Sequence, residues 1–133
     1  MSIFLREILH GRAATILAMG TKEDCQVLDF LQELAGKDAN EAGKIWALLD
    51  HTKDHGPPRN EQKCRFFKKE RIFEFKTTGG VRIMAFWDDN RVIICSHAFM
   101  KKSQKTPRIQ ITRSIECKES YFAAKAAGNL SFE

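Results

Sequence analysis

The stretch Gly79–Pro107, GGVRIMAFWDDNRVIICSHAFMKKSQKTP, decides the fold that the sequence predicts. Two runs in it, Val81 to Trp87 and Val92 to Phe99, are rich in β-branched and aromatic residues, which is typical of strands. The cluster around Asp89-Asn90 supplies residues that favour a turn, so we expect a β-hairpin. The second strand leads directly into Met-Lys-Lys-Ser-Gln-Lys-Thr-Pro, and a rigid sheet would therefore hold a group of cations at its end.

The segment before the hairpin, Cys64–Lys76 (CRFFKKERIFEFK), predicts one more strand, because polar and apolar residues alternate in its second half. Phe73 and Phe75 are expected on one face of the sheet. The residues of opposite parity are expected on the other face: Ile72, Glu74 and Lys76. Thr78-Gly79-Gly80 can form the turn to the next strand.

Two amphipathic helices are predicted before these strands. A Thr-x-x-Asp pattern from Thr21 resembles a capping box and begins a helix over about residues 22–35. An Asp-x-x-Glu pattern from Asp38 begins a second helix, which ends before Gly56-Pro57-Pro58. Their apolar stripes have helical spacing: Val27, Phe30, Leu31 and Leu34 in the first, and Ala42, Ile45, Trp46 and Leu49 in the second. The short link makes them neighbours that can cover one face of a sheet.

Thr106-Pro107 is typical of an N-cap and first helical residue, and predicts a last helix that ends near Gly128. The run Ala13–Met19 is either a first strand or the end of a short helix, since periodicity does not decide between them. The predicted fold class is α+β, a small twisted antiparallel sheet with two N-terminal helices and one C-terminal helix. The helices would pack on one face of the sheet and leave the other face open.

The bulk properties indicate one domain over residues 1–133, with 43% hydrophobic and 29% charged residues. No apolar run approaches the roughly 18 residues of a membrane span, and the first residues do not form a signal peptide. We therefore expect a cytoplasmic protein that does not bind a membrane.

The four cysteines, Cys25, Cys64, Cys95 and Cys117, lack the paired spacing that zinc sites and redox dithiols favour. We expect four reduced and mostly buried thiols, with neither a bound metal nor a cofactor. Cys95-Ser96-His97 is the one place in the sequence where a metal would have to be sought.

Charge is distributed unevenly along the chain. Residues 1–60 hold 7 Lys or Arg against 9 Asp or Glu, whereas residues 61–133 hold 15 against 8, so the halves carry −2 and +7. The second half is therefore the anion-binding half. Such a surface attracts either a phosphate backbone or an acidic protein, and charge alone does not choose between them.

These residues resemble a known family. Glu74-Phe75-Lys76, the strand with Arg82, and above all His97–Pro107 (HAFMKKSQKTP) resemble the RelE/HigB-type toxins of bacterial type II toxin–antitoxin pairs, in their phage-associated branch. The resemblance covers about residues 26–122 and implies a twisted antiparallel sheet flanked by helices. It also implies cleavage of mRNA in the decoding site of a translating ribosome. The partner it implies, besides the ribosome and mRNA, is an antitoxin, often a helix-turn-helix DNA-binding protein.

A metal-independent ribonuclease needs a base for the 2′-OH, cations for the charge on phosphorus and an acid for the leaving oxygen. Arg82 is the candidate for clamping the phosphate, and Lys76 shares a face with Glu74. The lysines after the second strand could stabilise the transition state or donate a proton: Lys101, Lys102 and Lys105.

His97 is a further candidate acid or base, because its imidazole could titrate near neutral pH. Its parity with Ile93 and Cys95 favours instead a core or hydrogen-bonding role. The only tyrosine, Tyr121, lies near the end of the last helix, whereas related toxins place a base-stacking side chain at the site. Other aromatic residues could stack a base but are expected in the core: Phe66, Phe67, Phe86 and Trp87.

Three functions remain open at this stage. The leading hypothesis is a ribosome-dependent endoribonuclease that cuts mRNA by 2′-OH attack. A toxin of the same fold, or a phage protein, could instead bind a host protein such as DNA gyrase without cutting RNA. A nucleic-acid-binding module without toxicity would bind with steep salt dependence and have no growth phenotype.

Overall fold

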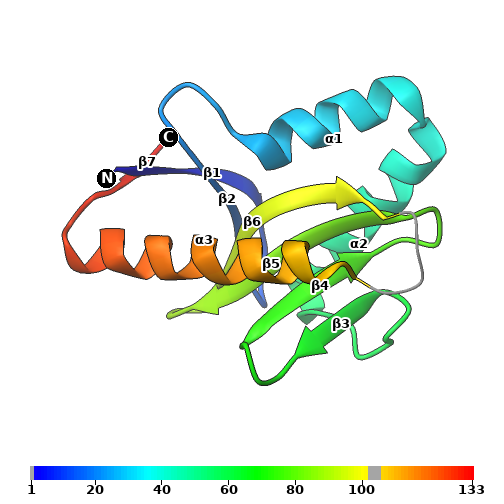
Figure 1. The fold of residues 1–133 in the computed structure, drawn as a ribbon. Helices are drawn as coiled ribbons and strands as arrows, with labels where there is room; N and C mark the ends of the chain where they lie inside the picture. Colours follow the sequence, from blue (N-terminus) through cyan, green and yellow to red (C-terminus); the bar gives the residue numbers. More distant parts are fainter. Residues whose placement is uncertain (1, 102–105) are drawn as a thin grey trace.

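A seven-stranded mixed sheet runs through the part of the chain that the structure describes, in the order β3-β4-β5-β6-β2-β1-β7 (Figure 1). The structure is a computed structural model that describes residues 2–101 and 106–133. The elements in these ranges are, in chain order, β1 (Ile3–His10), β2 (Thr15–Gly20), α1 (Gln26–Lys37), α2 (Ala39–His55), β3 (Cys64–Phe67), β4 (Ile72–Lys76), β5 (Val81–Asp88), β6 (Val92–Met100), α3 (Arg108–Ala126) and β7 (Leu130–Phe132).

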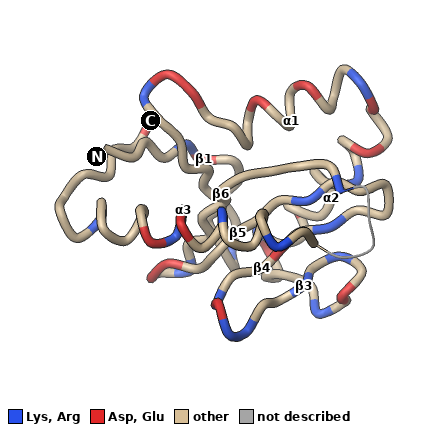
Figure 2. The backbone as a smooth tube through the Cα atoms, viewed as in Figure 1, with Lys and Arg blue, Asp and Glu red and all other residues tan. Residues whose placement is uncertain are grey.

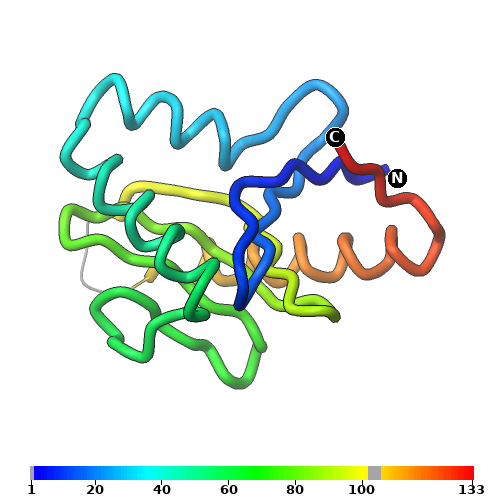
Figure 3. The backbone as a smooth tube through the Cα atoms, turned by 180° about the vertical axis from the view of Figure 1, so that it is seen from behind, coloured from blue at the N-terminus to red at the C-terminus, as the bar shows by residue number. Residues whose placement is uncertain are grey.

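The predicted fold class is wrong. The chain begins with the β1–β2 hairpin rather than with helices, and the ambiguous run Ala13–Met19 contributes strand β2. The sheet is mixed, because β2 pairs with β6 and β1 pairs with β7 in parallel. Helices cover both faces: α1 and α2 lie on one side, and α3 lies across the face that was expected to be open (Figures 1 and 3).

A β-bulge explains why the first residues show no clear period. Ile3 and Leu5 alternate with polar or half-exposed neighbours and pack beneath α3. The pairing of β1 with β2 then shifts between Glu7 and Leu9. An extra residue in a strand reverses the faces of all the side chains that follow it. Leu9 therefore packs, like its neighbour Ile8, against the core on the opposite side, and no single alternation describes the strand.

Two apolar cores, one on each face of the sheet, hold the layers together. The first lies under α1 and α2 and contains, among others, Ile16, Val27, Ile45, Phe75 and Ile93. The second lies under α3 and contains, among others, Leu5, Met84, Phe86, Ile94 and Tyr121. None of the described helices is long and apolar enough to cross a membrane.

Most of the predicted strands and helices are present, with shifted ends. The predicted hairpin is confirmed as β5 and β6, and Phe73 and Phe75 face the first core as expected. The segment Cys64–Lys76 forms two strands rather than one, because the chain turns back at Arg71, whose φ is 58°. The first helix begins at Gln26 rather than near residue 22. The main-chain N–H of Asp24 donates to the Thr21 hydroxyl, but this hydrogen bond lies before the helix.

Glu41, in the first turn of α2, connects the helix to the turn between β4 and β5. Its buried carboxylate accepts hydrogen bonds from the Thr77 hydroxyl at 2.6 Å and from the Gly79 N–H at 3.1 Å. Lys44 forms an ion pair with it at 2.9 Å. A Cβ at residue 79 would lie 2.1 Å from the carboxyl carbon, so this approach requires glycine. The hydrogen bond from Thr77, followed by that from Lys44, lowers the pKa of Glu41.

We expect Glu41→Gln to lower the free energy of unfolding by about 1.5–3 kcal/mol at pH 7, because hydrogen bonds to a charged acceptor are lost. The folded-state pKa lies below the unfolded value of 4.5, so the stabilisation is complete above that pH and is lost as the pH falls further. Denaturant unfolding at pH 7 and at pH 3 measures the difference. Glu33→Gln, at an exposed position of α1, is the control. An equal deficit of Glu41→Gln at both pH values would contradict this account.

Candidate functional site

Charged side chains gather on the α3 side of the sheet, where β4, β5 and β6 approach the start of α3. Lys76 is paired with Arg82 across β4 and β5, and Glu74 is paired with Arg65 across β3 and β4. Cross-strand partners project from the same face of a sheet. Figure 2 shows Lys and Arg segments along β3, β4 and the adjoining end of β6. We call four of these residues the cation cluster: Arg65, Lys76, Arg82 and Lys101.

Lys101 joins the cluster directly after β6. Its N–H donates to the carbonyl of Gly80 at 2.7 Å, and a Cβ at residue 80, where φ is +103°, would lie 2.7 Å from the Lys101 carbonyl. The Gly79-Gly80 turn thus fixes the main chain that carries this lysine. Burial lowers the pKa of Lys101, and the neighbouring charges of Arg82, Lys76 and Arg65 lower it further, against an opposing effect of Glu74. The cations therefore repel one another, and a bound anion would relieve the repulsion.

Arg82 and Glu74 form a nearly buried ion pair beneath the cluster. Glu74 is fully buried and Arg82 is 8% exposed. Arg82 Nη1 donates to the carbonyls of Thr77 and Val81, each at 2.8 Å. Nε lies 3.8 Å from Glu74 Oε1, which is too far for a hydrogen bond, and neither atom has a hydrogen-bond partner among the described residues. Burial lowers the pKa of Arg82, and Glu74 opposes this effect. Arg82, the residue expected to clamp the phosphate, is thus almost completely buried, and that role stays a prediction.

Thr106 connects the start of α3 to this ion pair. Its hydroxyl donates to Glu74 Oε2 at 2.8 Å and is buried. The expectation that Thr106 caps the helix is wrong, because the N-cap is Pro107 and α3 begins at Arg108. The Thr106 hydroxyl bonds to the Glu74 carboxylate instead of to a main-chain N–H of the first turn of α3. The first turn of α3 is therefore anchored beside the cation cluster.

His97 lies on the α3 face rather than with Ile93 and Cys95. The register of β6 on β5 shifts at Ser96, so His97 is opposite Met84. Its Nε2 donates to Gln110 Oε1 on α3 at 2.9 Å. Burial, followed by the charge of Arg113, lowers the pKa of His97 from 6.5 to about 4, although the Gln110 bond opposes this. At neutral pH the imidazole is a buried, uncharged hydrogen-bonding group, and its catalytic role stays a prediction.

The remaining candidates are distributed differently. Lys102 and Lys105 lie outside the described residues. Tyr121 is not near the cation cluster: its hydroxyl donates to Asp88 Oδ2 at 2.5 Å, and Lys125 pairs with the same carboxylate. Burial and Asp88 raise the pKa of Tyr121, so the phenol stays protonated.

The aromatic residues near the sheet edge divide into buried and exposed ones. Phe86 is fully buried, whereas Phe66 and Trp87 are 45% and 39% exposed. Phe67 is half-buried, and the Arg65 guanidinium lies 4.8 Å from its ring centroid. Among these aromatic residues, Phe67 is therefore the one whose ring contacts a member of the cation cluster, Arg65.

Sequence reasoning missed Arg65 and Gln110. Arg65 was overlooked because Cys64–Lys76 was interpreted as one strand, in which Arg65 had no cross-strand partner. A turn at Lys68–Arg71 would have placed it opposite Glu74. No pattern in the sequence indicates that Gln110 meets His97, because the contact depends on how α3 crosses the sheet.

The four cysteines are thiols, and those of Cys25, Cys64 and Cys95 are buried. Burial raises the pKa of Cys64 and Cys95 to about 12, so both thiols are protonated at neutral pH. Among residues 2–101 and 106–133, no three His, Cys, Asp or Glu side chains are grouped so as to hold a metal ion.

The lowered pKa of His97 predicts how its ring titrates. The folded protein keeps the imidazole uncharged down to about pH 4, whereas the unfolded chain binds the proton near pH 6.5. Its contribution to stability is therefore complete above pH 6.5 and is lost as the pH falls toward 4. We expect the His97 ring resonance in NMR to titrate with a midpoint near 4. A midpoint near 6.5 would contradict the buried, neutral assignment.

Because the Thr106 hydroxyl bonds to Glu74, we expect the loss of this hydroxyl to lower the free energy of unfolding more than the loss of an exposed one. Thr106→Val keeps the side-chain shape but leaves the buried Glu74 carboxylate without a donor, which should lower the free energy of unfolding by about 1–3 kcal/mol. Thr112→Val, at an exposed position of α3, should change it by less than about 0.5 kcal/mol. Denaturant unfolding of both variants tests the prediction, and equal losses would contradict it.

Comparison with known families gives one assignment. The family model for phage-derived Gp49-like proteins (DUF891) matches residues 32–118, which is more than half of the chain and includes the described cation cluster. No curated protein matches the sequence significantly. The Gp49-like proteins are a RelE-like toxin family, in agreement with the toxin resemblance of the motifs, whereas a specific relation to HigB stays a prediction. The chain belongs to the phage-derived Gp49-like family of RelE-like toxins.

Proposed function

We propose that this protein is the toxin of a type II toxin–antitoxin pair and cuts mRNA in translating ribosomes. The observation that carries the proposal is the cation cluster, in which four cations surround the single carboxylate of Glu74. This excess of positive charge suits a substrate that brings its own negative charge, such as an RNA phosphate. Membership of a toxin family supports the same reading.

The chemistry would be transesterification within the RNA. The 2′-oxygen loses its proton to a base and bonds to the adjacent phosphorus, while the bond from phosphorus to the 5′-oxygen breaks. The leaving oxygen takes up a proton, and a 2′,3′-cyclic phosphate remains. Lys101 is the best described candidate for proton transfer, because burial and the neighbouring cations lower its pKa and it lies at the end of β6 beside Gly80. Lys76 and Arg82 would hold the charge that develops on the phosphate.

The site supports dependence on the ribosome. The one carboxylate in the described site, Glu74, is fully buried and bonded to Thr106, and His97 is uncharged and bonded to Gln110. Neither group is exposed as a strong base for the 2′-OH. A ribosome that holds the mRNA in the reactive geometry would supply the alignment that these residues do not, and alignment accounts for a large part of many catalysed rates. An antitoxin partner would act by covering the cation cluster.

Expression in bacteria tests the proposal, with and without the adjacent open reading frame. We expect growth arrest within minutes and new mRNA 5′ ends inside translated codons, both removed by the neighbouring gene product. Lys101→Ala should reduce cutting by about 10²-fold or more, since it removes a proton-transfer group. Lys37→Ala, an exposed lysine in the last turn of α1, should cut normally.

The possible outcomes separate the hypotheses. Arrest without new RNA ends would contradict the nuclease and point to a protein target such as DNA gyrase. Undiminished cutting by a folded Lys101→Ala protein would overturn the role assigned to this lysine. An absence of arrest would contradict toxicity itself.

A further inference from the structure

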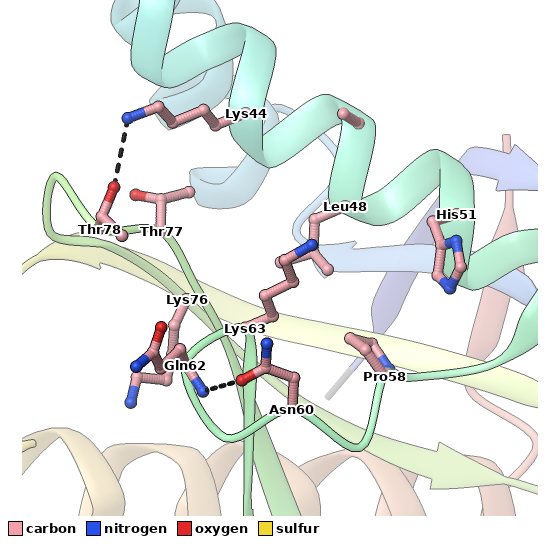
Figure 4. Close-up of a pocket in the computed structure, with 11 residues that line it drawn as sticks. Lys44, Leu48, His51, Pro58, Asn60, Gln62, Lys63, Lys76, Thr77 and Thr78 are labelled. Atoms are coloured by element: carbon pink, nitrogen blue, oxygen red, sulfur yellow. Dashed lines mark hydrogen bonds between the residues drawn. The ribbon is translucent and has the colours of Figure 1, made fainter.

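A pocket of about 390 Å³ lies between α2, the loop before β3 and the turn between β4 and β5 (Figure 4). It is on the α2 side of the sheet, away from α3. Lys76 lines this pocket and also belongs to the cation cluster, so the two features share one residue. The volume lies in the range of about 300–1,000 Å³ that is typical of small-ligand sites.

The polar part of the pocket is positively charged. Lys44, Lys63 and Lys76 line it, and none of its lining residues is Asp or Glu. Lys44 is compensated by its ion pair with Glu41, 2.9 Å away. Lys63 and Lys76 form no ion pair among the described residues, and Lys76 Nζ donates to the main-chain carbonyl of Glu61 at 3.0 Å. Lys63 is therefore the cation of the pocket that no described carboxylate neutralises, whereas Lys76, whose side chain shares a face with Arg82, connects the pocket to the cation cluster.

The other wall of the pocket is apolar. Leu48 and Ala47 of α2 and Pro58 of the following loop form it, next to the His51 ring (Figure 4). An apolar wall with the ammonium group of Lys63 beside it fits a ligand that has an aromatic body at one end and a negative charge at the other. Among the components of an RNA strand, a nucleotide with its phosphate has this chemistry.

We propose that the pocket holds one nucleotide of the RNA strand, with its base against Leu48 and Pro58 and its phosphate at Lys63. The neighbouring phosphate of the same strand would then lie at the cation cluster, which Lys76 borders. The inference rests on the proposed function for the identity of the strand as RNA. It assigns to the α2 side of the sheet a role in choosing which nucleotide flanks the cut.

NMR on the isolated ¹⁵N-labelled protein tests the pocket without requiring catalysis. Three probes are titrated: inorganic phosphate, 5′-AMP and a trinucleotide with 2′-O-methyl groups, which cannot be cut. We expect AMP and the trinucleotide to shift the amide signals of Ala47, Thr77 and Thr78, and the trinucleotide alone to shift those of Gly80 and Lys101 as well. Lys63→Glu should weaken binding of both nucleotides at least tenfold. Lys22→Glu, an equal charge change at an exposed loop position, should not.

Each alternative result overturns part of the inference. Shifts by phosphate that equal those by AMP would mean a simple anion site without a base pocket. Binding of AMP without the trinucleotide would mean a site for a free nucleotide. Trinucleotide shifts that avoid the pocket would refute it even if the protein cuts mRNA. Conversely, pocket binding that Lys63→Glu removes, in a protein that never cuts mRNA, would support the pocket and refute the proposed nuclease.

Discussion

The arrangement of the candidate site depends on the burial of one carboxylate. Glu74 has no solvent exposure, and an ionised carboxylate in such a position must find compensation inside the protein. Arg82 of β5 supplies charge and Thr106, just before α3, supplies a hydrogen bond, so Glu74 brings three elements together. Loss of one partner from a buried pair typically costs about 3–5 kcal/mol. The pairing of Glu74 with Arg82 therefore keeps β4 and β5, and the cations that they carry, in a fixed arrangement.

The strands that carry the site, β4, β5 and β6, could be predicted from the sequence, because β4 alternates regularly and the turns carry distinctive residues. The shared face of Glu74 and Lys76 and the position of Lys101 at a strand end follow from that alternation. How deeply Arg82 is buried could not be predicted, since it depends on the path of α3 over the sheet. The same is true of the contact between His97 and Gln110.

Two β-bulges account for the main errors about faces and strands. The bulge in β1 puts Leu9 on the same side as its neighbour Ile8, which hid the strand from a search for regular alternation. The bulge at Ser96 moves His97 from the face of Ile93 and Cys95 to the α3 face, where it is buried and hydrogen-bonded as expected. A bulge adds a single residue and has no fixed sequence signature, so it escapes periodicity. Without β1 and β2, the sheet appeared small, antiparallel and open on one face.

The parallel pairing of β2 with β6 has a consequence for the order in which the protein can form during synthesis. Ile16 pairs with Ile93, so the middle of the sheet joins segments that leave the ribosome far apart in time. Until β6 emerges, the hairpin of β1 and β2 lacks its partner, and long-range pairings of this kind fold slowly. Unfinished chains therefore cannot close the sheet. The central pairing of the sheet therefore forms only after β6, which ends at Met100, has been translated.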